Sequence, residues 1–148
     1  MYYTRSFVKG FKFKNINSKL TLYRYSQGSR LNLIDIEHCD GSTYTTAGSY
    51  FHLVDDDDNV YMSLGYYQLF GTRWLTNVIV EKEYRNIGIG YTVLKYFIKR
   101  YKITHLSVHE SNRPARKLYE KLGFKEYYMI DSFKHGLLDG RMIIMVIK

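Results

Sequence analysis

Cysteine and proline are nearly absent from this chain of 148 residues, which contains one of each. The single cysteine, Cys39, excludes an internal disulfide and any zinc site built from several thiolates. No run approaches the roughly 20 consecutive apolar residues that a transmembrane helix needs. The first residues lack an apolar segment followed by a small-residue cleavage site, so we expect no secretory signal. These absences predict a cytoplasmic protein without a membrane partner.

Acidic residues are fewer than basic ones, because 14 Asp and Glu stand against 22 Lys and Arg, a net charge of +8. A basic excess suits acidic partners such as nucleic acid or a phosphate-bearing cofactor. The basic residues are scattered and form no long run, so nucleic acid is not the favoured partner. Most of the 16 tyrosines lie among strand-like residues, where tyrosine is an ordinary half-buried side chain.

An acidic run, Asp55-Asp56-Asp57-Asp58-Asn59, is the sharpest change in composition. A calcium-binding loop spaces its carboxylates and places a glycine among them, and this run does neither. We therefore expect a solvated hairpin turn between two strands. The triplet His38-Cys39-Asp40 has no further cysteine or suitably spaced ligand, so we expect an incidental thiol and no metal site.

Patterns of apolar residues divide the chain into strands and helices. We expect strands at residues 20–25, 49–54, 60–67, 73–80, 103–108, 124–130 and 142–147, and short helices within residues 32–39. One longer helix is expected at residues 88–101. A second begins at Ser111 or Asn112, both good N-caps, and ends at a left-handed cap at Gly123. Strands that alternate with helices predict a mixed α/β sheet in one domain, residues 1–148.

The segment from Arg85 to Gly90, Arg-Asn-Ile-Gly-Ile-Gly, stands between a buried strand and the first long helix. Its glycines let the backbone approach a ligand closely, and the N–H groups at a helix N-terminus bind anions such as a pyrophosphate. It is no dinucleotide fingerprint, because Val93 stands where a third glycine belongs, and no P-loop, because it lacks Gly-Lys-Ser/Thr. Taken alone, the segment also fits a tight strand-to-helix connection.

A second segment, residues 112–124, reads Asn-Arg-Pro-Ala-Arg-Lys-Leu-Tyr-Glu-Lys-Leu-Gly-Phe. Together the two segments resemble the GNAT acetyltransferases, whose signatures are Gln/Arg-x-x-Gly-x-Gly/Ala after a buried strand and Asn-x-x-Ala-x-x-Leu-Tyr-x-x-x-Gly-Phe. Both signatures are intact and in order, and residues 75–128 carry the resemblance most strongly. Gly65 in a preceding strand also fits the family pattern.

The resemblance implies a three-layer α+β fold, with a mixed, mostly antiparallel sheet of six to seven strands flanked by helices. It implies transfer of the acetyl group of acetyl-CoA to a primary amine by direct attack. The acceptor stays open among a protein lysine, a protein N-terminus and a small-molecule amine. The N-terminal third and the last hairpin would choose that acceptor. Residues 131–140 are expected to form an ordinary surface loop, and a share in the acceptor pocket is the alternative.

The resemblance also implies roles for individual residues. In the family, the backbone at the end of the strand before the glycine loop pairs with the pantetheine arm, and the loop N–H groups hold the pyrophosphate. The second signature supplies an asparagine that contacts the cofactor and a tyrosine that protonates the departing thiolate, here Asn112 and Tyr119. A packing role is the alternative for Tyr119. The implied cofactor site comprises Val78, Ile79, Val80, Arg85, Asn86, Ile87, Gly88, Ile89, Gly90, Tyr91, Asn112, Ala115 and Tyr119.

The general base is less clear from the sequence. Many family members place a glutamate on the strand before the glycine loop, or on the strand before the second signature, where this chain has Ser107. His109 shares a strand face with Ser107, and its imidazole is one candidate base, directly or through water. A solvent-facing histidine without a catalytic role is the equal alternative, so the sequence assigns no single base. Glu37, His38 and Glu110 are weaker alternatives, as is water alone.

Two other function classes stay open at this stage. The missing strand carboxylate fits a non-catalytic module that binds acyl-CoA on the same fold. The positive charge and the tyrosines fit an acyltransferase directed at RNA, which would require salt-sensitive binding. Exposed sheet edges are compatible with a monomer or a homodimer.

Overall fold

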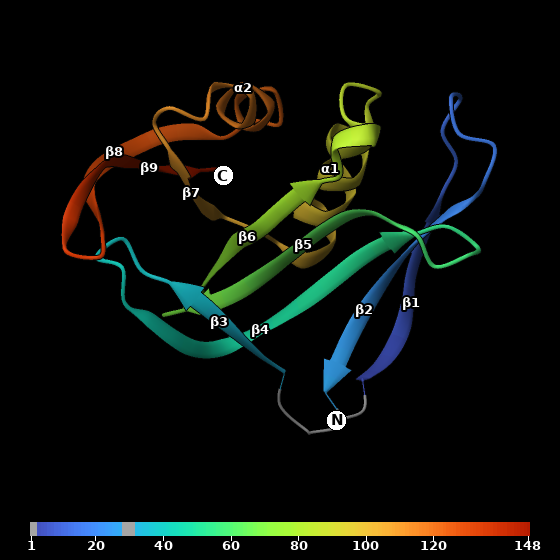
Figure 1. Ribbon diagram of the computed structural model, residues 1–148, viewed down its shortest axis with the longest axis horizontal. Coiled ribbons are helices and arrows are strands. Elements are labelled where there is room, and N and C mark those ends of the chain that lie inside the picture. The colour runs from blue at the N-terminus through green and yellow to red at the C-terminus, as the bar shows by residue number, and fades with distance from the viewer. Residues whose placement is uncertain (1–2, 28–31) are drawn as a thin grey trace.

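The computed structural model describes residues 3–27 and 32–148, and within them nine strands form one twisted sheet (Figure 1). The strands are β1 (Tyr3–Phe11), β2 (Leu20–Gln27), β3 (Leu33–Glu37), β4 (Thr43–Val54), β5 (Val60–Leu69), β6 (Thr72–Val80), β7 (His105–His109), β8 (Lys125–Lys134) and β9 (Leu137–Val146). The helices are η1 (Lys82–Tyr84), α1 (Ile89–Tyr101) and α2 (Arg113–Lys121). The order is β1-β2-β4-β5-β6-β7-β9-β8, and β3 pairs with β4 beside this path.

The predicted mixed, mostly antiparallel sheet is confirmed, because only β6 and β7 pair in parallel among the described strands. The expected six to seven strands are too few, since β1 and β3 were not predicted. The short helices expected within residues 32–39 are wrong. In this region the side chains of Leu33–Glu37 are alternately exposed and buried. Buried residues that recur at every second position, here Ile34 and Ile36, are typical of a strand.

The main core lies between the sheet and the two helices. Val93, Leu94 and Phe97 of α1 are fully buried. The Phe97 ring meets the edge of the Phe51 ring from β4 at a centroid distance of 4.8 Å. The predicted helix at residues 88–101 is therefore confirmed, with the apolar face that its spacing indicated. No helix within residues 3–27 and 32–148 is long and apolar enough to cross a membrane.

The opposite face of the sheet is covered by β3, which forms a second small core. Ile34 and Ile36 of β3 pack with Tyr67 of β5, and Trp74 of β6 packs against this group. Two glycines let β3 come this close. A Cβ atom on Gly48 would collide with Ile34 and with the Tyr66 carbonyl, and a Cβ atom on Gly65 would lie 3.2 Å from the Ile34 Cδ1 atom.

β6 and β7 are neighbours only at their first residues. They share two paired positions, Trp74 with His105 and Leu75 with Leu106. Beyond these, β6 has a bulge, because Thr76 pairs with Gly65 but Ile79 pairs with Ser63. The bulge contains Asn77, whose φ of 54° lies in the left-handed region of backbone conformation, which asparagine tolerates. A bulge bends its strand, so β6 turns away from β7 (Figure 1).

The predicted turn and helix caps are confirmed. The Asp55 carboxylate accepts hydrogen bonds from the N–H groups of Asp57 and Asn59, which closes the acidic turn between β4 and β5. The Asn112 side chain accepts a hydrogen bond from the Ala115 N–H at 3.3 Å and so caps α2. Gly123 follows α2 with a φ of 104°.

Gly48→Ala is expected to lower the free energy of unfolding by about 1–3 kcal/mol, because the added methyl group meets backbone and the buried Ile34. Urea unfolding measures this. Gly10→Ala is the matched control, since there the new Cβ meets only the flexible end of Lys19. A change of less than about 0.5 kcal/mol is expected for the control. Equal changes in both variants would show that β3 does not need the close approach.

Candidate functional site

The divergence of β6 from β7 leaves backbone groups of β6 free for a ligand. The Glu81 N–H donates to the Tyr61 carbonyl of β5 at 3.0 Å, and Ile79 is paired with Ser63. Since backbone groups alternate between the two edges of a strand, those of Val78 and Val80 point toward the β7 side. An extended chain that enters beside β7 can therefore pair with this edge.

The loop between η1 and α1 exposes the N-terminus of α1. Asn86 and Gly88 adopt left-handed φ values of 65° and 86°. The first backbone hydrogen bond of α1 runs from the Thr92 N–H to the Gly88 carbonyl, so the N–H groups before Thr92 lack partners in the helix. The first turn has no acidic residue, and Gly88 has no side chain that could cap it. Such a terminus is suited to an anion.

Arg85 holds this loop against the end of β6. Its Nε donates to the Val80 carbonyl at 2.8 Å. The Val80 carbonyl is therefore already engaged, which leaves the Val80 N–H and the Val78 backbone for a ligand.

α2 lies against the glycine loop. A Cβ atom on Gly90 would lie 3.5 Å from both Leu118 of α2 and Val80 of β6, so these three residues meet at one point. Ala115 packs against the same core. Tyr91 lies beside them with the ammonium group of Lys121 4.7 Å from its ring centre. The two signature segments predicted from the sequence therefore come together in space.

Tyr119 is on the buried face of α2. It is 8% exposed, and its ring meets Phe124 at a centroid distance of 6.1 Å. Burial raises the pKa of Tyr119 to about 12. The phenol therefore keeps its proton at neutral pH, which a general acid requires.

A pocket of about 380 Å³ lies on the β3 side of the sheet. Trp74 of β6 and Ser107 of β7 lie between two walls, one formed by β3 with its turn and the other by the β8–β9 hairpin. Its residues are Ile36, Glu37, His38, Cys39, Tyr44, Tyr67, Leu69, Trp74, Ser107, Tyr128, Ile130, Ser132, Phe133, Lys134, Asp139, Met142 and Ile144. The Phe133 N–H donates to the Cys39 carbonyl at 2.5 Å, so the two walls touch.

The pocket combines aromatic rings with carboxylates. Trp74 stacks on Tyr67 and His105, with ring centres 6.0 Å and 4.9 Å away. Glu37 and Asp139 are the acidic side chains among the lining residues. Aromatic faces and carboxylates attract cations, so the pocket suits an ammonium group.

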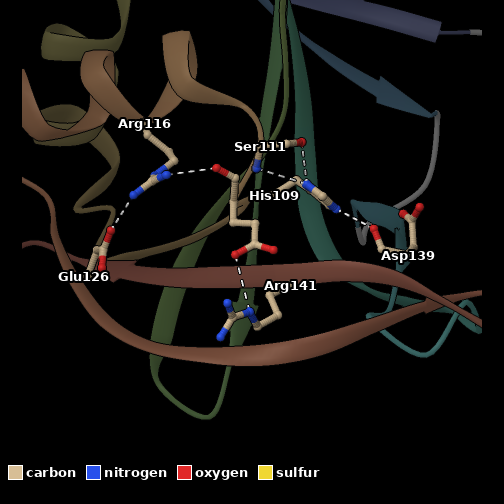
Figure 2. Close-up of polar contacts among 7 residues, drawn as sticks. His109, Ser111, Arg116, Glu126, Asp139 and Arg141 are labelled. Atoms are coloured by element: carbon tan, nitrogen blue, oxygen red, sulfur yellow. Dashed lines mark hydrogen bonds and ion pairs between the residues drawn. The ribbon is translucent and has the colours of Figure 1, made fainter.

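The residues considered as a base fall in different places. Glu37 and His38 line the pocket. The Arg141 Nε lies 3.3 Å from the Glu110 carboxylate, and the backbone carbonyl of Glu110 accepts a hydrogen bond from the Arg116 side chain (Figure 2). His109 shares a strand face with Ser107, and both of its ring nitrogens have protein partners. The aromatic lining was not found from the sequence, because it is gathered from four separate strands.

The site fits acetyl-CoA on two structural grounds. The free edge of β6 suits an extended amide-containing arm, and the uncapped N-terminus of α1 suits a pyrophosphate. Val78 and Val80 would hold the arm, and the loop from Asn86 to Gly90 would hold the phosphates. Asn112 caps α2 through its side-chain oxygen.

The Tyr119→Phe variant is expected to lose less free energy of unfolding at alkaline pH than the wild type does. The folded phenol has a pKa of about 12, and in the unfolded chain the value is about 10. The folded state therefore keeps the phenol protonated to a higher pH than the unfolded chain does. The protonated phenol contributes stability that is fully present below about pH 10 and is lost as the pH rises to about 12. At pH 10.5 the wild type should lose about 1 kcal/mol more than Tyr119→Phe in urea unfolding. Tyr127→Phe, at an exposed position, should behave as the wild type.

Comparisons with known proteins agree with this geometry. Residues 47–126 match the family model described as an acetyltransferase (GNAT) domain. The chain is 36% identical over 72 residues to an N-alpha-acetyltransferase of Sulfurisphaera tokodaii, a match that covers 45% of this chain and 41% of that protein. The chain therefore spans less than half of this relative's length.

Two solved structures share the fold at low sequence identity. A Bacillus subtilis acetyltransferase in complex with CoA has a TM-score of 0.57 at 16% identity, covering 68% of this chain and 76% of the other. Spermidine N-acetyltransferase from Vibrio cholerae, in complex with CoA and spermine, has a TM-score of 0.56 at 18% identity, covering 68% and 64%. Because the family model matches more than half of the chain, the protein belongs to the GNAT acetyltransferases, as its two signature segments predicted.

Proposed function

We propose that this protein transfers the acetyl group of acetyl-CoA to a primary aliphatic amine bound in the pocket between β3 and the β8–β9 hairpin. The observation that carries the proposal is the position of this pocket. Its lining includes Ser107, the first residue of β7 after the positions paired with β6, so an amine in the pocket can approach the unpaired part of the β6 edge. Family membership supports the reaction class.

The residues of the chain divide into those that hold the cofactor and those that act on the amine. Val78 and Val80 pair with the arm, and the N–H groups from Asn86 to Gly90, with Arg85, hold the pyrophosphate. Asn112 and Ala115 form the adjacent start of α2. Bound acetyl-CoA supplies the thioester whose carbonyl carbon the amine attacks. The N–H of Val78 lies at the bulge, where it can stabilise the negative charge on the carbonyl oxygen.

Proton transfers complete the reaction. An amine arrives as ammonium and must lose a proton before it attacks. Glu37 lines the pocket and is the carboxylate that we assign to hold the ammonium and receive its proton, directly or through water. As the new C–N bond forms, the nitrogen releases its remaining extra proton to water, the C–S bond breaks, and Tyr119 donates its phenolic proton to the departing sulfur. A phenol with a pKa of about 12 then regains a proton from water at neutral pH.

The pocket favours a flexible cationic amine as the acceptor. Its aromatic lining stabilises a cation without fixing the orientation of a peptide backbone. The fold shared with a spermidine acetyltransferase supports including a polyamine in the search. A panel of spermidine, a peptide with a free α-amino group and a peptide with one lysine distinguishes the three acceptor classes.

Gly88→Asp and Gly88→Asn test the cofactor site as a matched pair. Both residues tolerate the left-handed φ of 86°, and they differ by one negative charge. Thermal unfolding is measured with and without acetyl-CoA. At 100 times the dissociation constant, the wild type should gain about 2.7 kcal/mol, seen as a shift of several degrees. Gly88→Asn should keep most of this shift, and Gly88→Asp should lose it because its carboxylate repels the pyrophosphate. Similar shifts in both variants would exclude this anion site.

Glu37→Gln tests the acceptor site. Loss of the charge is expected to raise KM for the amine about tenfold, the size expected for a charge-assisted hydrogen bond, while KM for acetyl-CoA stays unchanged. Initial rates of acetyl transfer with each amine of the panel measure both constants. Glu120→Gln, on the exposed side of α2, is the control. Tight cofactor binding with no transfer to any amine would instead favour a non-catalytic module that binds acyl-CoA.

A further inference from the structure

Half of the β8–β9 hairpin extends beyond the end of β7. β9 pairs with β7 only from Met142 to Val146. Residues 131–141, which we name the overhang, continue past that point (Figure 1). The overhang supplies Ser132, Phe133, Lys134 and Asp139 to the pocket wall. Its position therefore decides the shape of the proposed acceptor site.

The overhang contains a bulge at Asp139. Ser132 pairs with Gly140, but Phe133 pairs with Leu138, so Asp139 is an extra residue on β9. A bulge leaves a backbone group without a partner in the ladder. The His109 ring fills this place, because its Nε2 lies 2.8 Å from the Asp139 carbonyl oxygen (Figure 2).

The bulge is shaped to admit the His109 ring. Gly140 has a φ of 117°, which favours glycine. A Cβ atom on Gly140 would lie 2.8 Å from His109 Nε2. The backbone at Gly140 therefore approaches the imidazole more closely than any other residue would allow.

Hydrogen-bond chemistry fixes the tautomer of His109. A carbonyl oxygen only accepts, so Nε2 must carry the proton. On the other side of the ring, the Ser111 backbone N–H donates to Nδ1 at 3.2 Å, and the Ser111 hydroxyl lies 2.7 Å from it. The Nδ1 lone pair is therefore also engaged. A general base needs a free lone pair toward the substrate, and this arrangement leaves none.

Neighbouring contacts hold the overhang in the same direction. The Glu110 N–H donates to the Arg141 carbonyl at 2.9 Å, and the Arg141 side chain pairs with the Glu110 carboxylate at 3.3 Å. On the far side, the Phe133 N–H donates a hydrogen bond to the backbone carbonyl of Cys39 in the β3–β4 turn. His109 and Glu110 thus both hold the overhang beside the end of β7. Among the side chains that the structure describes, His109 is the one that hydrogen-bonds to the bulge residue Asp139.

We propose that His109 is a positioning residue that fixes the bulge at Asp139, and with it the carboxylate at the rim of the acceptor pocket, and that it is not the base. The part that concerns the acceptor rests on the proposed function. The part that concerns the bulge does not, because it follows from the contacts of His109 alone.

Three variants test this proposal. His109→Leu removes both hydrogen bonds and keeps an apolar side chain. His109→Gln keeps an N–H donor that can reach the Asp139 carbonyl. His135→Asn is the matched control, because it replaces a histidine at the exposed tip of the same hairpin with a residue that tolerates its φ of 53°.

Amide hydrogen exchange is the readout that does not depend on activity. In His109→Leu, the amides of the overhang are expected to exchange about tenfold faster, the effect of losing one hydrogen bond, while those of α1 are unchanged. His109→Gln should restore most of the protection. Unchanged exchange in His109→Leu would overturn the proposal whether or not the protein transfers acetyl groups.

Kinetics distinguish a positioning residue from a base. With the best amine of the panel, His109→Leu should raise KM for the amine about tenfold and leave KM for acetyl-CoA unchanged. The pH profile of kcat should keep its shape, and His109→Gln should restore the amine KM. A fall in kcat of more than about 100-fold in His109→Gln, with loss of an ionisation from the profile, would instead identify His109 as the base. If no amine of the panel is acetylated, the proposed function is contradicted. The hydrogen-exchange experiment then still tests whether His109 fixes the bulge at Asp139.

Discussion

The bulge in β6 is the constraint on which the rest of the site depends. Asn77 accepts a left-handed backbone, β6 bends, and its pairing with β7 stops after two positions. A parallel pair that continued would have filled the backbone edge of Val78 and Val80. The bend therefore leaves open the strand edge on which the proposed cofactor arm would lie.

The sequence was most informative where local chemistry alone decides the structure. Asn112 as a cap, Gly123 after the helix and the carboxylate-closed turn at Asp55 need only neighbouring residues, and all three are as predicted. The resemblance assigned residues of the glycine loop and of α2 to one cofactor site, and in the structure the two segments lie together. Their meeting at Gly90 and Leu118 needed the resemblance as a guide.

The N-terminal third could not be predicted as well, for a physical reason. β3 is five residues long, and its pattern reads as a strand only when β5 and β6 are present to bury Ile34 and Ile36. The acceptor pocket is non-local in the same way, since its lining comes from β3 to β9. The role of His109 depended on a bulge thirty residues away, at Asp139, which no spacing in β7 reveals.

The position of Trp74 has a practical consequence. It is the only tryptophan of the chain, and it lies in the pocket lining, half-buried, stacked on His105 and Tyr67. Indole emission responds to the polarity and the ring contacts of its surroundings. The protein thus carries its single indole fluorophore at the place where the proposed acceptor would sit, so candidate amines can be screened by titration of the indole emission, without a label or a coupled reaction.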